Sequence, residues 1–439
     1  MNPHDIGVAM FAGVAALLVA RVPVGVSMLL SGAIGYAAIT GLWPLLNTLK
    51  TLPFSRFSSY TLSVIPLFLL MGEFATKGGM NAALFRAARA WFGHWRGGLA
   101  VATIGGCAAF GAICGSSLAT AATMSQVAGP EMRRAGYSPA LATGALAAGG
   151  TLGILIPPSV ILVIYAIYTE QSIGHLFVAA AIPGLLATAG YMLVVNLYAR
   201  FVPAAAPPSP RVPWRKRIAV SREVWPALLV FLIVVIGIYA GWFSPTEGAA
   251  VGAVSVGLLA ALVGEMRMRA FVDSLLATAE TAALMFVILL GAELFSAALA
   301  LSRLPVSVST WVISLGLAPV TVLAIILAIY LVLGCAMESL AMVLLTLPVF
   351  VPVVLALDFG LSQGQVLVWF GILVLVAVEV GMISPPFGLN LFVINALAKD
   401  VPITETWRGV LGFCVSDVLR LVILVAFPGL SLWLPSLSW

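Results

Sequence analysis

Two short motifs interrupt long apolar segments of the sequence in the same way. Residues 153–158 read GILIPP, and residues 381–386 read GMISPP. Proline has no backbone N–H, so the first pair cannot donate to the carbonyls of Gly153 and Ile154. The second pair likewise leaves the carbonyls of Gly381 and Met382 without a donor. A bare carbonyl in hydrocarbon is strongly unfavourable unless something meets it, and Na⁺ is a suitable partner because hard cations favour oxygen ligands. The alternative is a simple proline kink in a packed helix, but two matched motifs favour a pair of ion sites.

Each motif is accompanied by a polar stretch within another apolar region. The first stretch offers Ser116 and Ser117, and the second offers Glu338 and Ser339. Serine hydroxyls can bind Na⁺ or a substrate carboxylate at the positive N-terminal end of a helix, and they can also simply cap that helix. An ionised acid at mid-membrane demands a cation or a proton, so we expect Glu338 to bind Na⁺. A protonated structural acid and an exposed acid are the alternatives.

Other residues of chemical interest also lie in apolar segments. Glu379 stands shortly before the second Pro-Pro pair and is a candidate neighbour of the second ion site. Asp417 and Arg420 are three residues apart, which favours a mutual ion pair on one helix over a substrate site. The four cysteines lack CxxC spacing, so they are interpreted as packing residues rather than a disulfide framework or a metal site.

The composition places all of these residues in a membrane. The chain has 439 residues, of which 62% are hydrophobic and 8% charged, and its mean hydropathy is +1.14. Soluble domains carry about 25% charged residues, so this chain has too few charges to cover a water-facing surface. Apolar runs long enough to span the hydrocarbon recur along the whole chain. The sequence therefore predicts an all-α integral membrane protein in contact with the lipid bilayer, and nothing in it indicates nucleic-acid binding.

Apolar segments of helical length recur along the chain. The first is expected to be retained, because no basic residue precedes Arg21 and a cleaved signal peptide would need one. Helices are expected at 6–20, 24–40, 59–76, 138–168, 175–200, 224–243, 247–264, 271–301, 365–397 and 407–430, with two further apolar regions at 97–130 and 305–357.

Residues 97–130 are too short to cross the membrane twice. They contain no charged residue, and GAICGSS at 111–117 interrupts the apolar run midway. Each arm has about 15 residues, which is roughly 22 Å of helix against a hydrocarbon core of about 30 Å. We therefore expect a re-entrant hairpin whose tip lies at mid-membrane, where irregular backbone is tolerated only inside protein or beside water. A second hairpin is expected at 320–357.

The basic residues predict the orientation of the chain. Residues 201–223 are rich in proline and arginine and are interpreted as a linker or a segment lying on the membrane surface. With this segment, 17 of the 21 basic residues fall on one side of the predicted topology. Because basic residues concentrate in cytoplasmic loops, that side is cytoplasmic and both termini are periplasmic. Arg303 falls on the other side, where it is expected to be a solvated charge.

Three sequence blocks recur in the same order in both halves of the chain. PLFLLMG at 66–72 matches MFVILLG at 285–291, GSSLA at 115–119 matches MESLA at 337–341, and GILIPP matches GMISPP. Because the first hairpin opens inward and the second outward, the repeats are inverted, which is typical of secondary transporters with a site at the repeat interface. The predicted organisation is a first repeat at 1–200 with a broken helix at 138–168, a linker at 201–223, and a second repeat at 224–439 with a broken helix at 365–397.

The sequence resembles the large membrane subunit of tripartite ATP-independent periplasmic (TRAP) transporters, the DctM-like family. The motifs that carry the resemblance are FGAICGSSLATAATM, LGILIPPSVILVIYA, GIYAGWFSPTEGAAVGA, MESLA and VEVGMISPPFGLNLFVINA, and they span nearly the whole chain. The resemblance implies Na⁺-coupled uptake of a small organic acid, usually a carboxylate, across the bacterial inner membrane by an elevator-type fold. It also implies two partners, a small four-helix membrane subunit, expected as a separate chain, and a periplasmic substrate-binding protein.

The resemblance also implies site residues, by motif position, for two or more Na⁺ ions and the substrate. The family often has serine where Cys114 stands, aspartate at Glu338 and threonine at Ser384, and a thiol is a poor Na⁺ ligand. The implied residues are Gly115, Ser116, Gly153 and Ile156 for one ion, Gly334, Met337, Glu338, Gly381 and Ser384 for another, and Ser116, Ser117, Ser159 and Asn390 for the substrate.

Other functions are compatible with parts of the pattern. A self-sufficient Na⁺ or H⁺ carrier would transport without partners, and a channel would need a continuous pore rather than paired occluding breaks. An intramembrane enzyme is disfavoured because the three histidines are scattered at predicted membrane edges and neither HExxH nor a P-loop is present. No nucleophile–base pair can be nominated, so the chain is not expected to be an enzyme.

Overall fold

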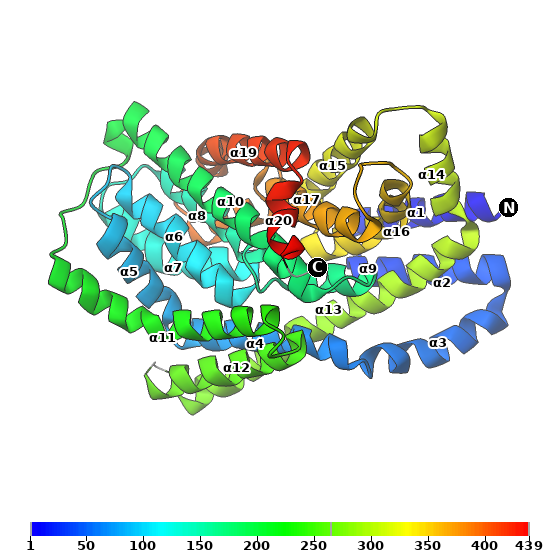
Figure 1. Ribbon diagram of the computed structural model, residues 1–439, viewed down its shortest axis with the longest axis horizontal. Coiled ribbons are helices and arrows are strands. Elements are labelled where there is room, and N and C mark those ends of the chain that lie inside the picture. The colour runs from blue at the N-terminus through cyan, green and yellow to red at the C-terminus, as the bar shows by residue number, and fades with distance from the viewer. Residues whose placement is uncertain (1, 264–265, 438–439) are drawn as a thin grey trace. The chain divides into compact units, whose positions relative to one another are not determined.

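The computed structural model describes residues 2–263 and 266–437, and all regular secondary structure within them is helical (Figure 1). The all-α class predicted from the sequence is therefore confirmed. The chain divides into two compact units, and three of the boundaries between them fall inside long helices, α13 (Met268–Ser302), α15 (Pro319–Ala336) and α17 (Gln363–Ile383). Unit 1 comprises Met1–Ser63, Ala279–Ile329 and Met337–Leu367, and unit 2 comprises Val64–Thr278, Tyr330–Ala336 and Val368–Trp439.

Unit 1 is built on close contacts between helices. A Cβ atom on Gly25 would lie 2.9 Å from the Cα of Ile288, and one on Gly32 would lie 2.8 Å from the Cα of Phe295. Only glycine lets two helix backbones approach so closely, so these positions fix the packing of α2 on α13. The helices wholly within unit 1 are α1 (Pro3–Val19), α2 (Val24–Thr40), α3 (Leu42–Phe57), α14 (Leu304–Ser314) and α16 (Ser339–Leu355).

Unit 2 is arranged around one buried helix, α8, which contacts α6, α7, α10, α18 and α19. Residues 143–155 of α8 are all buried. They are mainly alanine, glycine and threonine, and such small side chains allow several helices to pack around one. The helices wholly within unit 2 are α4 (Val64–Lys77), α5 (Met80–Phe92), α6 (Gly98–Cys114), α7 (Ser117–Arg134), α8 (Pro139–Leu155), α9 (Val160–Thr169), α10 (Ile173–Phe201), α11 (Trp214–Tyr239), α12 (Pro245–Leu262), α18 (Leu389–Leu397), α19 (Ile403–Ala426) and α20 (Gly429–Ser436).

Helices α6 and α7 form a helical hairpin in the apolar region where one was expected. A turn at Gly115 and Ser116 joins them, and Gly115 has a φ of +65°, which glycine adopts without steric cost. The two arms return to the same end, because the N–H of Leu99 donates a hydrogen bond to the hydroxyl of Tyr137 at 3.1 Å. The hairpin therefore presents its turn at the opposite end from its entry and exit.

Both Pro-Pro motifs interrupt a helix. In the first, α8 ends at Leu155 and α9 begins at Val160; in the second, α17 ends at Ile383 and α18 begins at Leu389. Both Pro–Pro peptide bonds are cis. The helix breaks expected from the missing proline N–H groups are therefore present.

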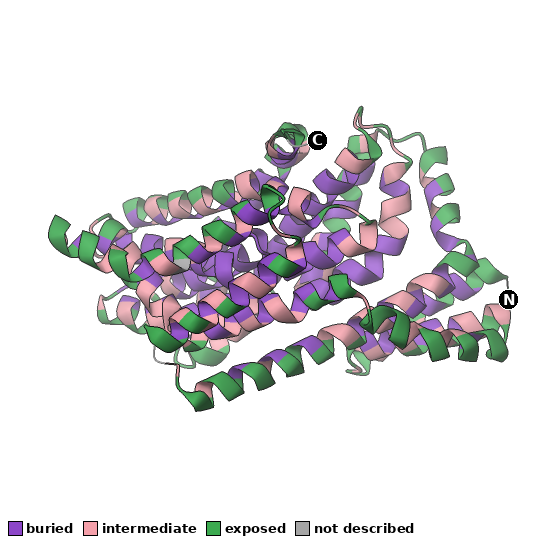
Figure 2. Cartoon of the chain, turned by 60° about the horizontal axis from the view of Figure 1, so that its bottom comes forward, coloured by how far each residue is buried: buried purple, intermediate pink, exposed green. Residues whose placement is uncertain are grey.

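Several helices are suited to a bilayer. Figure 2 shows exposed residues recurring along the helices, and in α10 they include the large apolar residues Leu185, Leu193 and Phe201. Lipid-facing helices expose such side chains because hydrocarbon surrounds them. Among the described residues, seven helices are long and apolar enough to span a membrane when α8 and α9 are counted as one, or up to nine if each of two bent pairs is also one span. The seven are Pro139–Thr169, Ile173–Phe201, Pro245–Leu262, Met268–Ser302, Pro319–Ala336, Gln363–Ile383 and Ile403–Ala426.

The structure contains helices that the sequence pattern did not predict. α3, α5 and α20 were not expected, and the region 305–357 is divided into α14, α15 and α16. α5 carries Arg86 and Arg89, so its apolar residues form one face rather than a continuous run. α3 and α20 each contain proline, which marks helix ends more often than interiors.

The expected linker at 201–223 is partly helical. α11 begins at Trp214, so the second half of this segment is the first part of a helix rather than a connection. Its start is held on α5, because Nε1 of Trp91 donates to the hydroxyl of Ser221 at 2.9 Å. The guanidinium of Arg217 lies over the ring of Trp214 at 5.1 Å. The basic segment is therefore an ordered part of unit 2.

Candidate functional site

The turn of the first hairpin lies against the break between α8 and α9. A Cβ atom on Gly115 would lie 2.7 Å from the carbonyl oxygen of Pro158, and one on Gly153 would lie 2.6 Å from the carbonyl oxygen of Ser116. Ile156 is the extended residue that ends α8. The residues implied for the first ion are therefore grouped within unit 2, where the backbone of the hairpin turn contacts the backbone of the break.

Oxygen atoms of α7 face this break. The hydroxyl of Thr120 donates to the carbonyl of Ser116 at 2.7 Å, and a Cβ atom on Gly153 would overlap that hydroxyl. The hydroxyl of Ser116 accepts from the N–H of Ala119 at 3.4 Å, so this serine caps α7, as one alternative predicted. Carbonyl and hydroxyl oxygens each have two lone pairs, so capping leaves capacity for a cation. Thr120 was missed by the sequence analysis, although its place four residues after Ser116 puts it on the same helix face.

Three residues implied for the substrate, Ser117, Ser159 and Asn390, are buried in unit 2. Ser117 donates to the sulfur of Met382 at 3.5 Å, at the end of α17. The amide nitrogen of Asn390 donates to the carbonyl of Ala147 on α8 at 3.1 Å, and its Oδ1 is buried without a hydrogen-bond partner among the described residues. Ser159 caps α9. The second broken helix thus contacts the first hairpin and the first broken helix through these side chains.

The second Pro-Pro break is also closely packed within unit 2. A Cβ atom on Gly381 would lie 2.6 Å from the Cα of Gly334, so the two glycines bring α15 and α17 together. Ser384 donates its hydroxyl to the carbonyl of Val380 at 2.7 Å and its N–H to the carbonyl of Gly381 at 3.2 Å. The expectation that the prolines leave the Gly381 carbonyl bare was therefore wrong, because the chain tightens by one residue before the break. One lone pair on this oxygen remains for another partner.

Glu338 stands at the start of α16. Its Oε2 accepts a hydrogen bond from the N–H of Ala341 at 3.4 Å, so the acid caps the helix, and the residue is half-buried. Met337 is buried beside it in the chain. Both residues belong to unit 1, whereas the other three residues implied for this ion belong to unit 2. Their joint role in one ion site stays a prediction.

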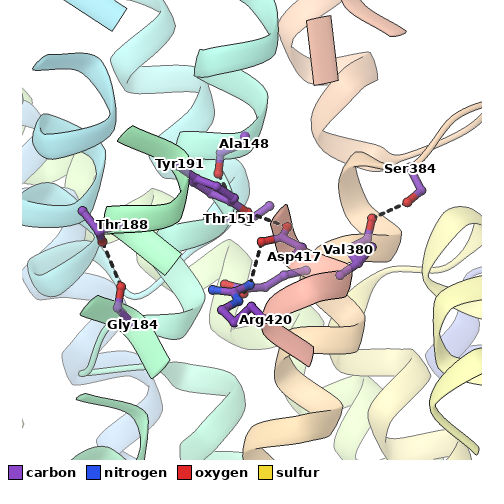
Figure 3. A network of polar contacts seen from close by, with 10 residues as sticks. Ala148, Thr151, Gly184, Thr188, Tyr191, Val380, Ser384, Asp417 and Arg420 are labelled. Atoms are coloured by element: carbon purple, nitrogen blue, oxygen red, sulfur yellow. Dashed lines mark hydrogen bonds and ion pairs between the residues drawn. The ribbon is translucent and has the colours of Figure 1, made fainter. Parts of the chain in front are cut away.

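A buried polar network joins helices α8, α10, α17 and α19 (Figure 3). Arg420 contacts Asp417 at 3.0 Å, which confirms the ion pair predicted from their spacing, and it also contacts Glu379 at 2.8 Å. The hydroxyl of Tyr191 donates to Asp417 at 2.6 Å and lies 3.1 Å from the hydroxyl of Thr151. Glu379 was predicted to neighbour the second ion site, and its partner in the structure is Arg420. Tyr191 and Thr151 were missed because no local spacing marks them.

The sequence also contains one match to the G-x-S-x-G pattern of serine hydrolases, GLSQG at 360–364. The hydroxyl of Ser362 accepts from the N–H of Gln365 at 3.3 Å, and the side chain of Gln365 accepts from the N–H of Ser362 at 3.1 Å. This reciprocal pair caps the start of α17. A nucleophile elbow places the serine between a strand and a helix, and no strand precedes Ser362 in the described residues. The GLSQG match is therefore a helix cap and not a nucleophile elbow.

The ligand types at the first break suit a monovalent cation. Within residues 2–263 and 266–437, no group of three or more His, Cys, Asp or Glu side chains could hold a metal. The cysteines are free, and Cys114 is buried. An ion bound here would rely on carbonyl and hydroxyl oxygens, and unwound carbonyls beside half-helix ends are the ligands that transporters use for Na⁺.

The same fold occurs in solved membrane transporters. The YdaH transporter of Alcanivorax borkumensis is similar with a TM-score of 0.63 and 17% identity, over 98% of each chain. MtrF of Neisseria gonorrhoeae is similar with a TM-score of 0.55 and 13% identity, over 97% of this chain and 95% of that one. At these identities the likeness concerns the fold, which is that of a multi-pass membrane transporter.

The model of the tripartite ATP-independent periplasmic transporter DctM component matches residues 11–430. This chain therefore belongs to the DctM family and is a TRAP transporter large permease subunit. The C4-dicarboxylate large permease DctM of Pseudomonas aeruginosa is 39% identical over 87% of this chain and 88% of its own length. DctM of Vibrio cholerae is 34% identical, over 98% and 97%. The sialic acid large permease SiaM of Vibrio cholerae is 31% identical, over 96% of each chain.

Proposed function

We propose that this chain is the transport subunit of a TRAP system that couples uptake of a small organic acid to Na⁺ entry across the bacterial inner membrane. The observation that carries the proposal is the contact between the first hairpin turn and the α8–α9 break. There the carbonyl of Ser116, the hydroxyl of Thr120 and the main chain of Gly153 meet in the interior of unit 2. Neutral oxygens grouped at membrane depth, away from water, are suitable ligands for a dehydrated monovalent cation.

Two sets of oxygen ligands would serve two or more Na⁺ ions. The carbonyls near the breaks would supply the neutral ligands. Glu338, the one acidic residue among the implied ion ligands, would offset part of the positive charge of the ions. The first set is Gly115, Ser116, Gly153 and Ile156; the second is Gly334, Gly381 and Ser384 with Met337 and Glu338.

The substrate would bind beside the helix N-termini that the first hairpin turn and the α8–α9 break create. Ser117 begins α7 and Ser159 caps α9, so both lie where backbone N–H groups and the helix dipole favour a carboxylate. The amide of Asn390 retains a hydrogen and an oxygen for a further polar contact after its bond to Ala147. The substrate class proposed is a small organic acid; relatives are named for C4-dicarboxylate, sialic acid and ectoine.

The mechanism proposed is an elevator movement that depends on loading. The hairpins α6–α7 and α15–α16 would enter the membrane without crossing it, and the two repeats would be inverted, with both termini periplasmic. Na⁺ would order the hairpin turns and complete the anion site. Movement is permitted only when ions and substrate are both bound, because an empty site would carry bare polar groups into hydrocarbon.

Two partners complete the system proposed here. A small four-helix membrane subunit would bind this chain, and a periplasmic substrate-binding protein would deliver the acid. The proposal includes both because the family match covers residues 11–430 and its description is that of one component of a tripartite system.

Reconstitution into liposomes tests the proposal. The chain and its small subunit are reconstituted, the binding protein with radiolabelled acid is added outside, and uptake is followed under an inward Na⁺ gradient or an equal K⁺ gradient. Uptake is expected with Na⁺ and is expected to stop when an ionophore collapses the gradient. Equal uptake in K⁺ would contradict Na⁺ coupling. Equal uptake without the binding protein would instead favour the self-sufficient carrier.

A further inference from the structure

The two end residues of the buried polar network occupy matching positions on the two broken helices. Thr151 stands two residues before Gly153 of the GILIPP motif, and Glu379 stands two residues before Gly381 of the GMISPP motif. Thr151 lies on α8 and Glu379 on α17. Each is therefore in the last turns of a helix whose end carries proposed Na⁺ ligands.

A series of contacts joins these two residues, and Figure 3 labels Thr151, Tyr191, Asp417 and Arg420 of it. Tyr191 donates its hydroxyl hydrogen to Oδ2 of Asp417 at 2.6 Å. The Thr151 hydroxyl lies 3.1 Å from that of Tyr191 and 2.8 Å from the carbonyl of Ala148, so it joins Tyr191 when its one hydrogen turns from that carbonyl to the tyrosine oxygen. Oδ1 of Asp417 lies 3.0 Å from Nη2 of Arg420, which donates to Oε2 of Glu379 at 2.8 Å. We call Thr151, Tyr191, Asp417, Arg420 and Glu379 the polar bridge. All of them belong to unit 2.

The polar bridge lies in the dry interior of the unit. Thr151, Tyr191, Asp417 and Glu379 are 0% exposed and Arg420 is 5% exposed. Hydrogen bonds and ion pairs in such low-dielectric surroundings hold their partners firmly, because water cannot replace a lost contact. Oε1 of Glu379 and Nε and Nη1 of Arg420 already have no hydrogen-bond partner among the described residues. A displacement of the last turn of α8 or α17 that the bridge did not follow would add to these unpaired groups, so the bridge favours movement of both turns together.

Close packing keeps the supporting helices from absorbing such a displacement. A Cβ atom on Gly144 of α8 would lie 2.5 Å from the carbonyl carbon of Gly409 on α19, so these backbones are in contact. The ring of Tyr191 packs edge-on against Phe413 of α19 at 5.4 Å. The helix that carries Asp417 and Arg420 is thus held directly against α8 and α10.

We propose that the polar bridge couples the two Na⁺ sites, so that an ion bound at one Pro-Pro break positions the carbonyls at the other. The inference rests on the proposed function, and it assigns Thr151, Tyr191, Asp417, Arg420 and Glu379 as positioning residues that touch neither ion. Na⁺ binding at the α8 end fixes the turn that contains Thr151, and the bridge transmits this to the turn of α17 that contains Glu379. Coupling of this kind typically changes affinity by about 5- to 150-fold.

Tyr191→Phe is the variant that tests the coupling most directly. It removes the hydroxyl that joins Thr151 to Asp417 and keeps the ring that packs on Phe413. The full chain is purified with its small subunit in lipid nanodiscs and titrated with NaCl, at ionic strength held constant with choline chloride, by tryptophan fluorescence and calorimetry. The wild type is expected to bind Na⁺ cooperatively, and Tyr191→Phe is expected to lower the Hill coefficient to about 1 and raise the midpoint about fivefold or more.

Two further variants separate positioning from general stability. Thr188 is on the same helix as Tyr191, and among the described residues its hydroxyl bonds only to the carbonyl of Gly184, at 2.9 Å within that helix. Thr188→Val should therefore bind Na⁺ as the wild type does. Thr151→Val removes the other hydroxyl of this pair, and with it the 2.8 Å bond to the carbonyl of Ala148 within α8, with little change in shape. It should repeat the effect of Tyr191→Phe, including when Tyr191→Phe fails to fold.

The outcomes distinguish the bridge from the transport function. Cooperative Na⁺ binding in the wild type that is unchanged in both Tyr191→Phe and Thr151→Val would overturn the coupling and leave the proposed function standing. A wild type that does not respond to Na⁺ would overturn both. Loss of cooperativity in Thr188→Val as well would show that any change in this region has the same effect, and would also overturn the coupling.

Discussion

Asn390 on α18 donates its amide hydrogen to the carbonyl oxygen of Ala147 on α8 at 3.1 Å, across 243 residues of sequence. This bond fixes the orientation of the amide, because the reverse orientation would set two oxygens against each other. One amide hydrogen and the buried Oδ1 remain without a partner among the described residues. A buried amide group left this way costs about 1–3 kcal/mol, which a polar group of the proposed substrate would recover.

We expect Asn390→Leu to weaken substrate binding. A hydrogen bond to a charged group contributes about 1.5–3 kcal/mol, so the loss corresponds to roughly a 10- to 150-fold rise in the substrate concentration for half-maximal uptake. Asn196→Leu is the matched control, because this amide bonds to the carbonyl of Met192 within its own helix at 2.9 Å. Equal losses in both variants would contradict a substrate role for Asn390.

Gly153→Ala is expected to reduce Na⁺ affinity. The added methyl group would overlap the hydroxyl of Thr120 and lie 2.6 Å from the carbonyl oxygen of Ser116, so the hairpin turn has to move away from the break. Overpacking of this kind costs about 1–3 kcal/mol, which is about a 5- to 150-fold change in the Na⁺ midpoint if the ligands bear it. The midpoint is measured from Na⁺-dependent uptake and Na⁺-induced thermal stabilisation.

Gly174→Ala provides the control for that substitution. Its added methyl group would find its nearest neighbours at 3.6 Å, an ordinary contact, so uptake and thermal stability should match the wild type. A Gly153→Ala protein that folds and keeps the wild-type Na⁺ midpoint would exclude the α8 break from the ion site.

The helix breaks could be predicted from the sequence because their cause is local. Pro157 and Pro158 cannot donate hydrogen bonds wherever they are placed, so the end of α8 follows from two residues. The turn at Gly115 is likewise local, since its φ of +65° favours glycine. The carbonyl of Gly381 shows the limit of this reasoning, because its new donor, the N–H of Ser384, depends on the way the last turn tightens.

The polar bridge could not be predicted in full, for the opposite reason. Asp417 and Arg420 are close in sequence, so their ion pair is a helix-face relationship that spacing reveals. Tyr191 is 226 residues from Asp417, and its hydroxyl meets that acid only because α10 and α19 pack together. Glu379 and Arg420 lie 41 residues apart on separate helices. Such contacts depend on how the helices pack, and the spacing of residues along the sequence does not indicate which helices pack together.

Glu338→Gln tests the acid proposed for the second Na⁺ site. The amide keeps the oxygen that can cap α16 at the N–H of Ala341 and removes the negative charge, so the fold should be retained. Na⁺ affinity is expected to fall and Na⁺-dependent uptake with it, because an ion at membrane depth loses its counter-charge. Glu405→Gln, at an exposed ion pair with Arg408, should leave both unchanged. An unaltered Na⁺ dependence in Glu338→Gln would remove Glu338 from the site.

Arg420→Met is expected to destabilise the protein strongly, because it strands two buried carboxylates with no guanidinium. Removing one partner from a buried ion pair typically costs about 3–5 kcal/mol, whereas an exposed pair contributes about 0–1 kcal/mol. Arg408→Met breaks the pair with Glu405 at 3.2 Å, where the arginine side chain is 75% exposed, and should change the unfolding free energy little. Unfolding is followed in detergent micelles by tryptophan fluorescence. Adding Glu379→Gln to Arg420→Met should restore part of the stability, since Asp417 keeps the hydrogen bond from Tyr191 at 2.6 Å; no recovery would show that the loss comes from packing rather than from charge.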